Sequence, residues 1–137
     1  MGTESLQTRI SLNNQKIREL ESHISQLKRL LNRLLAKQSE FEKYTLNFSA
    51  LMSQEVANVQ KIRSIENMRT AKGLADSFHI SFTGVQANNT FDSYKRIENS
   101  IQQKIEETER DLIKAKCEIN QLESDISSCR HEISIAQ

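Results

Sequence analysis

The side chains that could carry out catalytic or metal chemistry are few and widely separated. The three histidines, His23, His79 and His131, have no cysteine or aspartate at the spacing of a metal site. Cys117 and Cys129 lie twelve residues apart on one predicted helix, about 18 Å, which is too far for a disulfide between them. These residues predict no metal site, and both cysteines are expected to be reduced thiols.

Two clusters of charged residues, one acidic and one basic, are the other candidates for a chemical site. No phosphate-binding glycine loop or nucleophile motif accompanies them, and the net charge of the chain is only +1. Both clusters are therefore typical of solvated helix faces, and we expect no enzyme, no cofactor and no nucleic-acid partner. The acidic cluster is Glu106, Glu107, Glu109 and Asp111, and the basic one is Lys28, Arg29, Arg33 and Lys37.

The composition favours long helices over a closed globular core. Of the 137 residues, 27% are charged and 5% are aromatic, and there is no proline and only three glycines. The length fits one domain. No apolar stretch is long enough to span a membrane, and the first residues lack the apolar segment of a standard signal peptide, so a cytoplasmic protein is expected.

The order of elements predicts an all-α fold, a long antiparallel helical hairpin. Residues 78–91 form the one interruption, because this stretch is uncharged, rich in aromatic and β-branched residues, and contains Gly84. We expect a single domain, residues 1–137, with one helix over about 5–71, a turn over about 72–88 and a second helix over about 89–135. The turn centre is thus placed near residues 72–90.

Both predicted helices carry apolar residues at alternating spacings of three and four, the pattern of a coiled coil. In the first helix this pattern runs from Ile17 to Leu34, and then the frame changes, which predicts a stutter, a bend or a change of partner. A bend is expected near residues 45–49. In the second helix the pattern is regular. Its seam positions are Tyr94, Ile101, Ile105, Thr108, Leu112, Ala115, Ile119, Leu122, Ile126, Cys129, Ile133 and Ala136.

The two arms of the predicted hairpin are unequal. Counted from Gly84, about 80 residues precede the turn and about 53 follow it, so an overhang of ~15 to 25 residues is expected at the N-terminus. Its apolar stripe would lack an internal partner, and exposing it is unfavourable by ~25 cal/mol per Å². The stripe therefore predicts binding to another chain. The expected binding residues are Leu6, Ile10, Ile17, Leu20, Ile24 and Leu27, with Phe41 and Phe48.

The predicted turn resembles that of a known family. Phe82-Thr83-Gly84, followed by Ala87 and Phe91, resembles the turn of the WXG-type helical hairpins of Gram-positive type VII secretion, with Phe in place of Trp. The chain is longer than the ~100 residues usual there, and its long coiled-coil second helix resembles the small helical partners encoded beside LXG toxins. The resemblance implies that Phe82, Gly84, Ala87 and Phe91 shape the turn.

That resemblance also implies a function. The chain would be a targeting or chaperone protein that binds the helical N-terminal region of a secreted LXG-type toxin, alone or with another small helical protein. It would leave the cell with the toxin, without a signal peptide. Tyr94 and Glu98 match the Y-x-x-x-D/E export signal, although the match lies at the start of the second helix instead of near the C-terminus.

Two alternatives stay open at this point. The chain could be a structural coiled coil, such as a tether, a scaffold or a homo-oligomeric bundle, with Phe82 as an ordinary aromatic residue in its turn. The match at Tyr94 and Glu98 could likewise arise by chance. A genomic neighbour that encodes an LXG toxin would separate the secretion partner from the scaffold.

Overall fold

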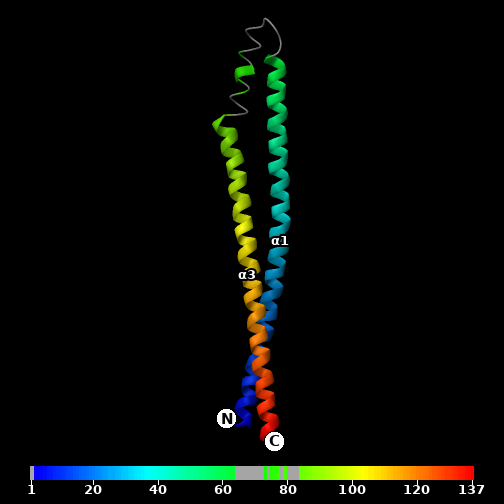
Figure 1. Cartoon of the computed structure of the whole chain (residues 1–137), viewed down its shortest axis with the longest axis vertical. Coiled ribbons are helices and arrows are strands. Elements are labelled where there is room, and N and C mark those ends of the chain that lie inside the picture. The colour runs from blue at the N-terminus through cyan, green and yellow to red at the C-terminus, as the bar shows by residue number, and fades with distance from the viewer. Residues whose placement is uncertain (1, 64–72, 74, 78, 80–83) are drawn as a thin grey trace. The chain divides into compact units, whose positions relative to one another are not determined.

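The structure, a computed structural model, describes residues 2–63, 73, 75–77, 79 and 84–137, and for residues 62, 63, 85 and 86 it describes the backbone alone. Two long helices account for most of them, α1 (Thr3–Arg63) and α3 (Val85–Ala136). They pack antiparallel with a short linking segment between them (Figure 1). The predicted all-α hairpin is confirmed.

A glycine directly precedes each helix. The N–H of Leu6 donates to the carbonyl oxygen of Gly2 at 3.2 Å, and the N–H of Asn88 donates to that of Gly84 at 3.1 Å. Glycine is an acceptable residue just before a helix because its backbone adopts the required conformation at little cost. The second helix thus begins at Val85, four residues before the predicted position at 89, and the first begins at Thr3 instead of 5.

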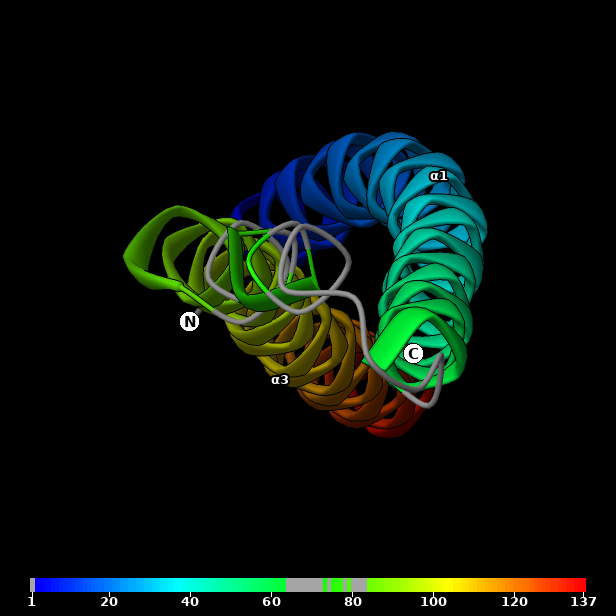
Figure 2. The ribbon, with the colours of Figure 1, turned by 90° about the horizontal axis from the view of Figure 1, so that it is seen from above.

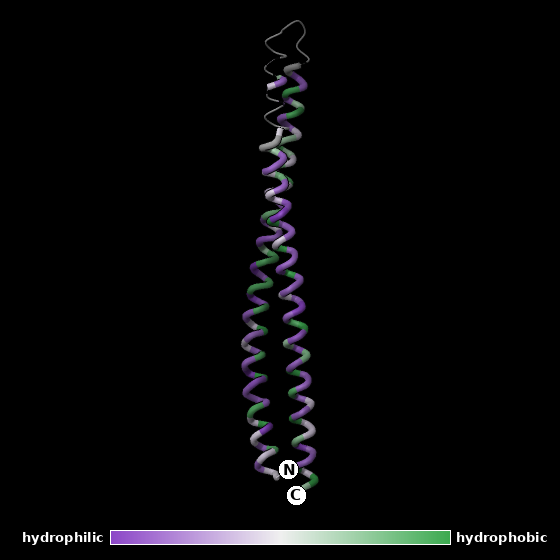
Figure 3. Tube along the Cα trace, turned by 90° about the vertical axis from the view of Figure 1, so that its left-hand side faces the viewer, coloured by the Kyte–Doolittle hydropathy of each residue, from purple (hydrophilic) through white to green (hydrophobic). Residues whose placement is uncertain are grey.

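Contacts divide the chain into two compact units, and each contains part of both helices. The terminal unit pairs Met1–Leu34 with Lys104–Gln137, and the linker unit is Leu35–Gln103. Figure 3 shows hydrophobic and hydrophilic residues alternating along both helices. This alternation follows the helical period, so that one stripe of each helix is apolar and meets the other helix.

The inward-facing positions of α1 keep one heptad frame from Leu6 to Val59. Beyond Leu34 they continue through Gln38, Phe41, Thr45, Phe48 and Met52, whereas Leu46 and Leu51 are exposed. The predicted change of frame is therefore wrong, and α1 is one unbroken helix in Figures 1 and 2. The sequence misled here because polar Gln38 and Thr45 occupy two of the seam positions. The predicted bend stays a prediction, because a helix can bend without a break.

Both polar seam residues have a partner on α3. The side-chain amide of Gln38 donates to the side-chain oxygen of Gln102, and the hydroxyl of Thr45 donates to the carboxylate of Glu98. One turn further along α1, the rings of Phe48 and Tyr94 pack edge to face with centroids 5.7 Å apart. These three pairs share one register within the linker unit.

This register removes the predicted N-terminal overhang. A hairpin centred at Gly84 would place Thr45 opposite residue 123, but Thr45 bonds Glu98. In the terminal unit, Leu6 is only 3% exposed, and Ile17 and Leu27 are also buried. The expectation that the N-terminal stripe lacks an internal partner is therefore wrong. Gly84 is not the centre of the hairpin but the start of its second helix.

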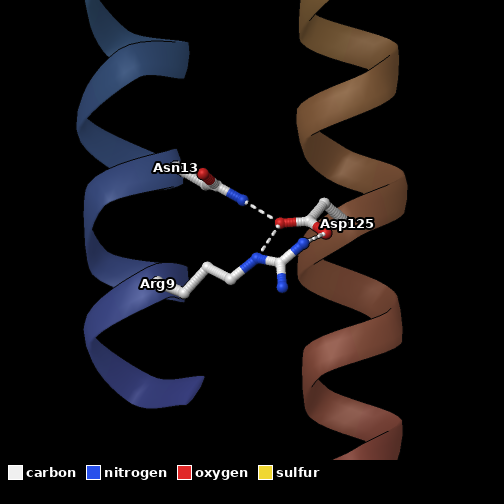
Figure 4. Close-up of polar contacts among 3 residues, drawn as sticks. All are labelled: Arg9, Asn13 and Asp125. Atoms are coloured by element: carbon white, nitrogen blue, oxygen red, sulfur yellow. Dashed lines mark hydrogen bonds and ion pairs between the residues drawn. The ribbon is translucent and has the colours of Figure 1, made fainter. Parts of the chain in front are cut away.

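A three-residue polar clamp joins the helices of the terminal unit (Figure 4). The Arg9 guanidinium donates two hydrogen bonds to the Asp125 carboxylate, and its Nε lies 2.7 Å from Oδ2. Asn13 donates to the same Oδ2 at 2.6 Å, and its side chain is buried. A charge-assisted bidentate pair of this kind fixes orientation as well as adding attraction.

The clamp changes the pKa values of both charged groups. The pKa of Asp125 lies below its ordinary value, first because Arg9 donates hydrogen bonds to its charged form and then because Asn13 does. The pKa of Arg9 is raised by the same hydrogen bonds and by the negative charge of Asp125. The clamp is therefore fully ionised at neutral pH.

We expect Ile17→Ala to lower the free energy of unfolding by roughly 2–4 kcal/mol, because it removes a buried side chain from the seam. Leu12→Ala, at a position on the same helix that is 53% exposed, should change it by no more than about 0.5 kcal/mol. Urea unfolding followed by circular dichroism measures both. If both substitutions change the free energy of unfolding by equally small amounts, the N-terminal stripe lacks an internal partner and the overhang is present.

We expect Asp125→Asn to lower the melting temperature at neutral pH. The pKa of Asp125 is lower in the folded chain than the unfolded value of 3.8, so its contribution is present above that value and disappears as the pH falls through the folded pKa. The difference between the variant and the parent should therefore vanish in acid. Asp111→Asn, which changes an exposed carboxylate of the same helix, is the control. An unchanged difference in acid would show that the carboxylate charge contributes nothing.

Candidate binding surface

The residues considered for chemistry are scattered. His23, His131 and Cys117 are exposed, and Cys129 is buried in the seam of the terminal unit. Among the residues that the structure describes, no three His, Cys, Asp or Glu side chains gather where they could hold a metal ion. In that same part of the chain, no helix is long and apolar enough to cross a membrane.

Aromatic residues occur in only one of the two units. All seven lie between Phe41 and Tyr94, so the linker unit contains every one and the terminal unit none. Each of the five that the structure describes remains at least partly exposed. Aromatic side chains usually bury a large area, and they are enriched at protein interfaces. The five are Phe41, Tyr44, Phe48, Phe91 and Tyr94.

The linker unit also contains two stretches that are poor in charge. The 41 residues from Thr3 to Lys43 include 13 charged ones, but the 17 from Tyr44 to Gln60 include one, Glu55. The 11 residues from Gly84 to Tyr94 also include one, Asp92. A helix that is apolar or uncharged on several faces is normally covered on several faces. Within the linker unit, only one face of each helix meets the other.

One flank of the linker unit exposes three large apolar side chains, Tyr44, Leu51 and Ile97, and we call it the tyrosine flank. They are 46%, 53% and 40% exposed. Tyr44 and Leu51 are seven residues apart, so they lie on the same face of α1. Ile97 occupies the equivalent heptad position of α3, because it precedes Glu98 as Tyr44 precedes Thr45. Such positions lie on one side of an antiparallel pair, as the equivalent pair Arg9 and Asp125 shows by direct contact.

Neighbouring side chains hold Tyr44 in place. Its hydroxyl donates to Glu40 at 2.8 Å, and its ring packs edge to face on Phe41. The hydrogen bond to Glu40, followed by the negative charge of Glu40, raises the pKa of Tyr44. Hydrogen bonds from Tyr44 and then from Lys37 lower the pKa of Glu40. The ring is thus oriented before any partner arrives.

The opposite flank of the linker unit contains a groove of about 410 Å³ between α1 and α3. Its walls are mostly apolar, with Ser49, Ser53 and Asn88 as polar members, and no charged residue lines it. By contrast, the two grooves of the terminal unit are lined by charged residues, including Lys16, Glu19 and Glu118. The residues that line the uncharged groove are Phe48, Ser49, Met52, Ser53, Val56, Ala87, Asn88 and Phe91.

The residues predicted to bind a partner fall into two groups. Leu6, Ile10, Ile17, Leu20, Ile24 and Leu27 face the seam of the terminal unit and are buried or half-buried, so the structure gives them a packing role. Phe41 and Phe48 are half-exposed in the linker unit, beside the flank and the groove just described. Sequence reasoning missed Tyr44, Leu51 and Ile97, although the loss of charge after Lys43 pointed to their surroundings.

The residues of the predicted turn and of the predicted export signal lie at different places in the hairpin. Gly84 precedes α3, and Ala87 and Phe91 line the groove, whereas Phe82 lies outside the described residues. Tyr94 packs on Phe48, and Glu98 accepts from Thr45 and pairs with Lys95 at 3.6 Å. Both candidate signal residues therefore have contacts within the hairpin, and their role in export stays a prediction.

Comparison with known proteins gives no match, whether with a family model, a curated sequence or a solved structure.

We expect the pKa of Tyr44 to lie above the ordinary tyrosine value, because its hydroxyl donates a hydrogen bond to Glu40 and because Glu40 is negatively charged. A spectrophotometric titration of tyrosine ionisation should show this step, and Tyr44→Phe should remove it. Glu40→Gln should return it toward the ordinary value. Glu118→Gln, which changes an exposed carboxylate of the terminal unit, should leave the titration unchanged. A step unaffected by Glu40→Gln would contradict the hydrogen bond.

Proposed function

We propose that the chain is a non-enzymatic partner protein that binds a helix of another protein through the tyrosine flank. The observation that carries the proposal is the combination of exposed aromatic and aliphatic side chains in the linker unit with two charge-poor stretches there, residues 44–60 and 84–94. Depletion of charge together with aromatic enrichment characterises the centre of protein interfaces.

The shape of the surface favours a helix as the bound element. Tyr44 and Leu51 repeat after seven residues on α1, and Ile97 lies on the adjacent helix of the unit. A helix that lies along this flank would present its own apolar stripe and complete a third layer of side chains. The terminal unit, by contrast, buries its aliphatic stripe internally and surrounds it with charge.

The partner that we propose is the helical N-terminal region of an LXG-type toxin that leaves the cell by type VII secretion. The hairpin of two long helices and the resemblance of the Phe82-Thr83-Gly84 segment to WXG-type turns support this choice. A structural coiled coil that self-assembles is the second candidate. The same exposed surface favours it, because a scaffold also needs an uncovered apolar face.

Replacing Tyr44, Leu51 and Ile97 together by Ser should weaken binding to the partner by tens- to about a thousandfold. About half of each side chain remains to be buried on binding, so the three contribute roughly 2–4 kcal/mol together. The measurement is co-expression with the adjacent genes, followed by co-purification and titration calorimetry with the captured protein. A toxin with a helical N-terminal region should be the protein recovered.

The matched control replaces Leu12, Ile113 and Ile135 by Ser, three side chains of the terminal unit that are at least as exposed. This control variant should bind like the parent. If both triple variants lose the partner equally, the flank has no special role. Self-association that the tyrosine-flank variant loses and the control variant keeps would favour the scaffold.

A further inference from the structure

We propose that the groove flank of the linker unit is the site at which a second copy of this chain docks, antiparallel to the first. The groove lies on the opposite side of the hairpin from the tyrosine flank. This inference is therefore additional to the proposed partner binding and does not depend on it.

The exposed edge of α1 beside the groove has a self-complementary order of sizes. Leu46 and Val56 are large, and Ser49 and Ser53 between them are small. Their spacings are three, four and three residues, so the order reads identically in both directions and all four lie on one side of α1. Leu46 is 70% exposed, and the other three line the groove.

A two-fold axis midway between Ser49 and Ser53 uses this order fully. Leu46 of one copy would lie opposite Val56 of the other, and each Ser49 would lie opposite Ser53. The two small residues let the helices approach closely, while Leu46 enters the groove of the other copy. An isologous contact of this kind closes on itself, so it gives a dimer and no longer assembly.

The charges permit the same arrangement. Neither the groove nor the edge of α1 from Leu46 to Val56 includes a charged side chain directed at the axis, because the single charge of that stretch, Glu55, lies at a seam position. Two copies can thus meet without burying like charges, which would be unfavourable. On the α3 side, the Nζ of Lys95 lies over the ring of Phe91, 5.4 Å from its centroid. The self-complementary order of sizes on α1 is therefore the feature that favours a second copy.

The area of the face limits the affinity of the dimer. The charge-poor stretch of 17 residues is about 25 Å long, and two helices side by side are about 20 Å across. The face therefore covers at most about 500 Å² per copy, less than the ~800 Å² of a standard interface. We accordingly expect micromolar dimerisation, half complete at roughly 10–100 μM.

Sedimentation equilibrium of the full chain alone, without any partner, tests the proposal. Leu46→Glu should raise the dissociation constant at least about a hundredfold, because it places an unpaired carboxylate in an apolar groove. Ile113→Glu, at a position of the terminal unit that is 63% exposed, should change it less than about threefold. A chain that is monomeric at ~100 μM, or equal loss in both variants, would overturn the proposal. Because no partner is present, failure of the proposed function cannot produce either result.

Cross-linking tests the direction of docking. With Cys117→Ser and Cys129→Ala as background, Ser49→Cys combined with Ser53→Cys should give a disulfide-linked dimer on oxidation. Ser49→Cys alone should not, because the two copies of residue 49 would be about 10 Å apart, beyond the ~7 Å limit for a disulfide. A dimer formed readily by Ser49→Cys alone would show parallel docking and would overturn the antiparallel arrangement. No covalent dimer from the double variant would move the interface away from this flank.

Discussion

The register between the two helices is the constraint on which the other features depend. Apolar seams tolerate sliding, because leucine and isoleucine pack acceptably at several offsets, but polar residues in a seam must meet their partners. Here Thr45 meets Glu98, Gln38 meets Gln102, and Arg9 and Asn13 share Asp125. A shift by one heptad would separate all these groups and leave buried Asn13 and Thr45 without hydrogen bonds from the other helix.

From that register follows the division of roles between the two units. Because the N-terminal stripe meets the C-terminal part of α3, the most regular coiled-coil sequence of the chain is used for internal packing. Its surroundings are charged, as a stable solvated coil requires. The linker unit differs in composition: its described aromatic side chains are all partly exposed, and residues 44–60 and 84–94 contain one charged residue each. Internal packing and the proposed binding therefore use different residues of the same helices.

Much of the fold could be predicted from the sequence, because the alternation of apolar residues at spacings of three and four is a local signal. It predicted two long helices, a hairpin and the seam of α3. The register is not local, and it was predicted wrongly. Gly84 appeared to be the centre of the turn, since it follows an aromatic run, whereas the structure makes it the residue before α3. That error alone created the expected overhang and assigned partner binding to Leu6, Ile17 and Leu27.

The proposed binding surface was not predicted from the sequence, for a related reason. Hydrophobic patterns identify residues that leave water, but they do not say which protein covers them. Tyr44, Leu46 and Leu51 break the heptad frame, and the sequence alone suggested that the frame itself had changed. The structure keeps the frame and leaves these three side chains outside it, on two opposite flanks. Apolar residues outside the heptad frame of an unbroken helix are thus better understood as additional exposed faces of that helix. They do not show that its seam has changed.

Two such faces on one helical pair allow two associations that do not compete for side chains. The tyrosine flank presents protruding residues, one of them oriented by Glu40, which suits a partner that supplies its own hollow. The groove flank presents a hollow beside a protruding Leu46, which suits a copy of itself. Since neither flank uses the polar pairs of the seam, each association can form or dissociate while the register, and with it the other flank, stays unchanged.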